Sequence, residues 1–88
     1  VWGSGKPRRE FLYSDDMAEA AVYLMRLPED AFARLTAPEA APLINIGAGK
    51  DLSIAELAAV VGEVVGYEGR FIYDASKPDG TPRKLLDT

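Results

Sequence analysis

The stretch from residue 43 to residue 73 constrains the fold most, because a strand, a capped helix and a second strand follow one another. Ser53 and Glu56 have the spacing of a capping box, in which each side chain satisfies a free amide at a helix start. Gly66 suits the left-handed position that ends many helices. Between them, apolar residues recur at helical spacing, namely Ile54, Leu57, Ala58, Val61, Val64 and Val65.

Short apolar runs flank this helix at residues 43–46 and 70–73. Both have lengths and compositions typical of strands. A strand, a helix and a strand over this distance are typical of a βαβ unit with parallel strands and a right-handed crossover. The sequence therefore predicts an α/β fold.

The part of the chain before this unit predicts a basic loop over residues 1–9, a strand over residues 10–13 and a helix over residues 17–27. Ser14, Asp15 and Asp16 suit the helix start, and Asp16 with Glu19 has capping-box spacing. Paired catalytic carboxylates or metal ligands are the alternative for the two aspartates, but capping explains them more simply. Pro28 ends this helix or opens a short one near residues 31–35.

Composition excludes several functions. The 88 residues are 48% apolar and carry a net charge of −4, which is ordinary for a globular protein and unfavourable for general binding to nucleic acid. No apolar run reaches the length of a membrane span, and no signal peptide is recognisable. Cysteine and histidine are absent, which excludes disulfides, thiolate zinc sites and Ser-His-Asp chemistry. We expect a cytoplasmic protein without nucleic-acid, membrane or metal partners, and we interpret the chain as part of a longer one.

The turn at residues 47–49 partly resembles a dinucleotide-binding loop. Gly47 and Gly49 follow a predicted strand and precede a helix, but Leu52 stands where the third glycine is needed. A flexible turn is the simpler interpretation, and we expect no cofactor site in this segment.

Basic residues gather near the start of the chain, where Lys6, Arg8 and Arg9 accompany Trp2. They form either a solvated basic loop or an anion site, because arginine binds phosphate through paired hydrogen bonds. Trp2 could supply a flat apolar wall to such a site, or pack in a core or interface.

A second cluster lies at residues 78–84. Its prolines and glycine are typical of a turn. A simple turn needs neither the second proline nor the pair Arg83 and Lys84. The sequence therefore predicts a rigid loop that presents the Asp79 carboxylate and two cations, and rigidity lowers the entropic cost of binding.

These motifs carry a family resemblance. Residues 2–5, 9–12 and 15–18 resemble the extended short-chain dehydrogenases/reductases of the NAD-dependent epimerase/dehydratase family. Residues 44–47, 64–67 and above all 76–87 are similar to the GDP-L-fucose synthase family within it. The resemblance covers nearly the whole chain except the variable connection.

The resemblance implies a two-domain parent enzyme. An N-terminal doubly wound domain, missing here, would bind NADP(H) and carry every catalytic group, and the parent would be a homodimer. It would convert GDP-4-keto-6-deoxy-D-mannose to GDP-L-fucose by 3,5-epimerisation and NADPH-dependent 4-reduction. Residues 1–88 would be the C-terminal substrate-binding domain in part, inactive alone. Its regions are 1–27 (loop, strand, helix), 28–42 (variable connection), 43–73 (βαβ unit) and 74–88 (the Pro-Asp-Gly-Thr-Pro-Arg-Lys loop).

By position, the resemblance assigns four substrate-binding residues: Trp2, Arg9, Asp79 and Lys84. We expect Arg9 to bind the diphosphate and Trp2 to pack against the nucleotide-sugar. Asp79 would accept hydrogen bonds from guanine or ribose, and Lys84 would add positive charge or orient the loop.

Two alternatives stay open. The chain could serve another epimerase/dehydratase that uses a UDP- or dTDP-sugar, or it could be a non-catalytic interaction module. A module predicts a stable monomer, whereas a partial domain predicts an apolar patch that drives association.

Overall fold

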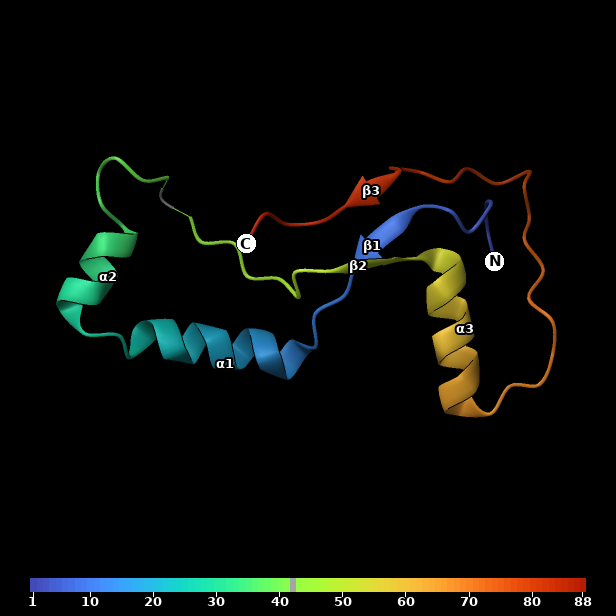
Figure 1. The fold of residues 1–88 in the computed structure, drawn as a ribbon, viewed down its shortest axis with the longest axis horizontal. Coiled ribbons are helices and arrows are strands. Elements are labelled where there is room, and N and C mark those ends of the chain that lie inside the picture. The colour runs from blue at the N-terminus through green and yellow to red at the C-terminus, as the bar shows by residue number, and fades with distance from the viewer. Residues whose placement is uncertain (42) are drawn as a thin grey trace.

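A computed structural model describes residues 1–41 and 43–88 (Figure 1). The described chain holds three helices and three short strands, which confirms the α/β class. In chain order they are β1 (Arg8–Glu10), α1 (Ser14–Met25), α2 (Glu29–Leu35), β2 (Asp51–Ser53), α3 (Ile54–Val65) and β3 (Arg83–Lys84).

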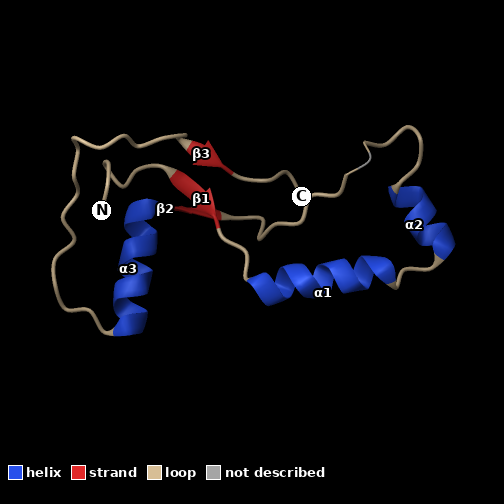
Figure 2. Cartoon of the chain, turned by 180° about the vertical axis from the view of Figure 1, so that it is seen from behind, coloured by secondary structure: helices blue, strands red, loops and turns tan. Residues whose placement is uncertain are grey.

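The strands form one small sheet in the order β2-β1-β3, drawn in red in Figure 2. The central strand β1 runs antiparallel to β2, with Arg9 opposite Leu52. It runs parallel to β3, with Arg9 opposite Lys84. The pairing of β1 with β3 therefore joins two segments that are separated by most of the sequence.

Helix α3 is formed as predicted. The Ser53 side chain accepts a hydrogen bond from the Glu56 amide at 3.1 Å, and the Glu56 carboxylate accepts one from the Ser53 amide at 2.7 Å. Gly66 ends the helix with φ 70°, in the left-handed region. Local sequence therefore defines both ends of α3.

The start of α1 differs from the prediction. The helix begins at Ser14 rather than at residue 17, and Tyr13 precedes it without a side-chain cap. Asp15 and Asp16 lie inside the first turn, so the predicted capping box of Asp16 with Glu19 is wrong. Acidic side chains in the first turn still complement the helix dipole. Pro28 precedes α2, as expected for a residue that opens a short helix.

The predicted strand positions need correction. Residues 10–13, 43–46 and 70–73 were expected as strands, but only Glu10 belongs to one. A ladder requires a neighbouring strand, and in the described chain the partners of β1 come from residues 51–53 and 83–84. The expected parallel βαβ unit over 43–73 is therefore replaced by β2 and α3. The loops at 1–9 and 74–88 instead contribute to the sheet.

The chain is extended and lacks a closed core. Its radius of gyration is 18.1 Å, whereas a compact domain of this length has about 12 Å. No large apolar side chain is buried in the described chain, and Val64 of α3 is 80% exposed. Helices α1 and α2 extend away from the sheet on the side opposite α3 (Figure 1). Neither they nor α3 are long and apolar enough to cross a membrane, as judged over residues 1–41 and 43–88.

Candidate functional site

The candidate site is built on two chain segments that lie side by side, residues 2–10 and 74–84. At one end Trp2 forms a parallel bridge with Asp74, and the Gly3 amide donates to the Asp74 carbonyl at 2.9 Å. At the other end the Arg8 amide donates to the Pro82 carbonyl at 2.8 Å. All four residues that the family resemblance assigned lie on this pair of segments.

Asp79 joins the two segments in their middle. Its Oδ1 accepts a hydrogen bond from the Ser4 amide at 2.6 Å, and its Oδ2 accepts one from the Ser4 hydroxyl at 2.8 Å. Gly3 lies against this carboxylate with φ 78°, and a Cβ at that position would overlap Oδ1. Residue 3 is thus restricted to glycine both by its backbone conformation and by the closeness of Asp79.

The Ser4 donors also change the acidity of Asp79. The hydrogen bond from the Ser4 amide, and after it that from the Ser4 hydroxyl, lower the pKa of the Asp79 carboxyl. Desolvation opposes this shift, and the nearby Lys6 ammonium adds to it. Asp79 is therefore held as a carboxylate.

Arg9 and Lys84 are neighbours across β1 and β3. The Arg9 Nη1 donates to the Arg8 carbonyl at 2.7 Å, and its Nη2 lies near Gly80 of the 78–82 turn. Within residues 1–41 and 43–88, neither side chain has a carboxylate at ion-pair distance. Both cations are thus available to an anionic ligand.

Trp2 is 73% exposed, and the Lys77 ammonium lies 5.2 Å from the centre of its ring. This distance is typical of a cation–π contact. Sequence reasoning missed Lys77, because nothing in the local sequence links it to an aromatic ring far away in the chain.

Two arginines of the predicted basic clusters have internal partners instead. The carboxylate of Asp51, whose side chain is 5% exposed, accepts from Arg8 Nε at 3.0 Å and from Arg83 Nε. The Arg83 bond is the larger cause of the lowered Asp51 pKa. Asp51 therefore ties β2 to the other two strands. Arg8, for which the sequence left a solvated loop and an anion site open, and Arg83, which was expected on display, are thus both engaged in ion pairs with Asp51.

Glu10 connects the sheet to two further loops. Its carboxylate accepts from the Gly49 amide at 2.7 Å and from the Leu86 amide at 3.1 Å. This acidic neighbour, together with the capping box of α3, leaves the Gly47–Gly49 turn unsuited to a dinucleotide phosphate. The residues of this segment do not fit NADP(H).

Two pockets flank the paired segments. One of about 130 Å³ is lined by Lys6, Pro7, Asp79, Gly80 and Pro82. Another of about 460 Å³ is lined by Glu10, Lys84, Leu85 and Leu86. Both lie next to the predicted site residues.

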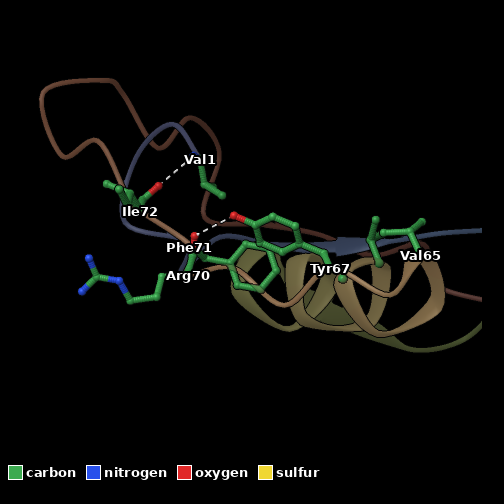
Figure 3. A pocket seen from close by; sticks show the side chains of 8 residues that line it. Val1, Val65, Tyr67, Arg70, Phe71 and Ile72 are labelled. Atoms are coloured by element: carbon green, nitrogen blue, oxygen red, sulfur yellow. Dashed lines mark hydrogen bonds between the residues drawn. The ribbon is translucent and has the colours of Figure 1, made fainter.

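A third pocket, of about 450 Å³, has none of the four predicted site residues in its lining (Figure 3). Its wall is mostly apolar and combines α3 with the segment after it. There the Tyr67 hydroxyl donates to the Arg70 carbonyl at 3.2 Å, and the N-terminal amine of Val1 donates to the Ile72 carbonyl at 2.8 Å. The remaining lining residues are Val61, Gly62, Val65 and Phe71.

Residues 1–47 match the NAD dependent epimerase/dehydratase family, and the chain belongs to that family. More particularly, the chain is similar to the GDP-L-fucose synthase of Escherichia coli, with 55% identity over 99% of this chain and 27% of that protein. It spans about a quarter of the length of the curated relatives that it matches.

Solved structures give the same picture. The GDP-mannoheptose C4 reductase of Campylobacter jejuni with NADP bound matches with a TM-score of 0.77 and 41% identity, over 99% of this chain and 25% of that one. A GDP-D-glycero-L-gluco-heptose synthase of the same organism, in the presence of NADPH, gives 0.79 and 36%, over 99% and 24%.

Proposed function

We propose that this chain is the nucleotide-sugar-binding part of a GDP-L-fucose synthase, an NADP-dependent enzyme that epimerises and reduces a GDP-linked 4-keto sugar. The observation that carries the proposal is the 55% identity to a GDP-L-fucose synthase over nearly the whole chain. The names of the matched solved structures support the GDP part, because those enzymes too act on GDP-sugars.

The geometry supports a division of roles along the paired segments. Arg9, which has no acidic partner in the described residues, would bind the diphosphate, and Lys84 beside it would add positive charge. The exposed Trp2 ring would pack against the nucleotide-sugar. Asp79 already accepts two bonds from Ser4, so hydrogen bonds to guanine or ribose would use its remaining lone pairs.

NADP(H) would be held by the rest of the parent protein, since the Gly47–Gly49 turn faces the Glu10 carboxylate. When bound there, the cofactor would supply the hydride for reduction at C4. This segment would supply substrate binding and no proton transfer. A homodimeric parent and a cytoplasmic location stay predictions.

The exposed apolar side chains favour this proposal over a free-standing interaction module. An extended chain without a buried apolar core, with Val64 and Val65 of α3 exposed, needs further protein to cover it. Light scattering of the isolated 88 residues tests this point. Association is expected, and a folded monomer would favour the module.

Calorimetry of the full-length protein with GDP and with UDP tests the nucleotide assignment. We expect GDP to bind more tightly. Tighter binding of UDP would reject the proposal in favour of another epimerase/dehydratase. In parallel, NADPH consumption with GDP-4-keto-6-deoxy-D-mannose is expected for the full-length protein and not for the 88 residues alone.

A further inference from the structure

We propose that Ser4 is a positioning residue for the GDP-sugar site, which acts by fixing Asp79. This inference rests on the proposed function and adds a residue to which the family resemblance assigned no role. Ser4 contributes two donors to one carboxylate across 75 positions of sequence.

The Ser4 hydroxyl takes part in two hydrogen bonds, one as donor and one as acceptor. The Ser4 hydroxyl donates to Asp79 Oδ2 at 2.8 Å and accepts a hydrogen bond from the Lys6 amide at 3.2 Å. The hydroxyl therefore connects the 78–82 turn to the loop that carries Lys6. Lys6 and Asp79 then line the same pocket of about 130 Å³.

The backbone on either side of Ser4 fits this role. Gly3 and Gly5 have φ 78° and 76°, so Ser4 lies between two left-handed positions. A side chain at Gly3 would meet Asp79, and one at Gly5 would meet the Tyr73 ring. The backbone is thus closely packed on both sides of Ser4, against Asp79 at Gly3 and against Tyr73 at Gly5.

The consequence for binding is electrostatic. Asp79 shares its pocket with Lys6, Arg9 Nη2 lies near Gly80 in the wall of that pocket, and Lys84 is the neighbour of Arg9 across the strands. None of these three cations has an ion-pair partner among the described residues. While Ser4 engages both of its oxygens, the carboxylate is directed at the 3–6 loop. Without the hydroxyl, Oδ2 loses its donor and the Ser4 amide alone holds Oδ1, so Oδ2 can turn toward those cations and compete with a diphosphate.

The test compares Ser4→Ala with Ser4→Thr in the full-length protein. Threonine keeps the hydroxyl, and alanine removes it. We expect Ser4→Ala to weaken GDP binding about fivefold to tenfold. NADPH affinity and kcat should stay within about twofold, and Ser4→Thr should bind GDP like the wild type.

A second readout needs no ligand. An NMR titration should show a higher Asp79 pKa in Ser4→Ala than in the wild type, because the hydroxyl bond is lost while the stronger bond from the Ser4 amide remains, and an unchanged pKa in Ser4→Thr. An unchanged Asp79 pKa in Ser4→Ala would overturn the inference, and so would a raised pKa with unchanged GDP affinity. Failure of the wild type to bind GDP would instead reject the proposed function, and the inference with it.

Discussion

The two sides of this molecule are held together in different ways. At the sheet, segments far apart in sequence meet through the carboxylates of Glu10, Asp51 and Asp79; we call this region the polar junction. In the helical limb, residues 11–41, the hydrogen bonds of the described chain join residues only a few positions apart. The limb's ion pair, Arg34 with Asp30, is likewise local and exposed.

The difference shows that the specific tertiary contacts of the described chain are concentrated at the polar junction. Helices of 12 and 7 residues are marginal in water without packing, and among the described residues no large apolar side chain of the limb is buried. In the polar junction, by contrast, hydrogen bonds between individual residues fix how the chain segments lie relative to one another. The candidate binding residues belong to the junction, as expected for a site that needs fixed positions.

The largest expected effect is the loss of the polar junction at low pH. Hydrogen bonds lower the pKa of Asp51 and Asp79 in the polar junction. Local hydrogen bonds from Ser76 and Ser53 also lower the pKa of Asp74 and Glu56. Their stabilisation is therefore complete above the ordinary carboxyl pKa, near 4, and is lost as the pH falls through the lower folded-state values. The full-length protein can be incubated at pH values between 6 and 2 and then probed by pulsed hydrogen exchange. The backbone amides of β1 should lose their protection from exchange below about pH 4. Opening that begins near pH 6 would contradict this account.

Removal of the Asp51 charge should have the next largest effect. Asp51→Asn deprives Arg8 and Arg83 of their shared partner at a nearly buried position. We expect the Tm of the full-length protein to fall by about 5–10 °C. The matched control is Asp30→Asn in the limb, which breaks an exposed pair and should leave Tm almost unchanged. Equal Tm changes would abolish the distinction between the two regions.

Gly3→Ala should destabilise the junction by about 2–3 kcal/mol, measured by urea unfolding of the full-length protein. Its φ is 78°, and the new methyl group would meet Asp79. Gly66→Ala is the control, because Gly66 has φ 70° but no atom within 4 Å of its Cβ position. It should cost about 1 kcal/mol and leave GDP affinity unchanged. If Gly66→Ala lowers the free energy of unfolding as much as Gly3→Ala does, the contact between residue 3 and Asp79 adds nothing to stability.

The smallest expected effect comes from the N-terminal residues of the two longer helices, α1 and α3, of which only α3 has a side-chain cap. Ser53→Ala removes the cap of α3 and should lower the free energy of unfolding by about 1 kcal/mol. Ser14→Ala, at the first residue of α1, removes no capping bond and should cost less than about 0.5 kcal/mol. Urea unfolding checks both, and a larger loss from Ser14→Ala would show that α1 is capped after all.

Local chemistry made part of the fold predictable. The capping box at Ser53, the end of α3 at Gly66 and the short helix after Pro28 depend on neighbouring residues, and all are present. The strands were misplaced because a strand is defined by its partner, and residues 51–53 and 83–84 carry little strand signal of their own.

The four candidate site residues were assigned by the family motifs, and local features such as capping and periodicity would not have assigned them. Trp2, Arg9, Asp79 and Lys84 fall on two adjacent segments, although their contacts with substrate stay a prediction. Ser4 was missed because a serine between two glycines gives no indication of a carboxylate 75 positions away. The ion pair of Arg8 with Asp51 was also missed, because the sequence does not reveal a partner 43 positions away.

Hydrogen exchange of the full-length protein with and without GDP tests the central claim most directly. The claim is that the polar junction presents the GDP-sugar site and that the helical limb does not. GDP should slow exchange in the paired segments, residues 2–10 and 74–84, and leave α1 and α2 unchanged. Protection of α1 and α2 without protection of the paired segments would contradict it.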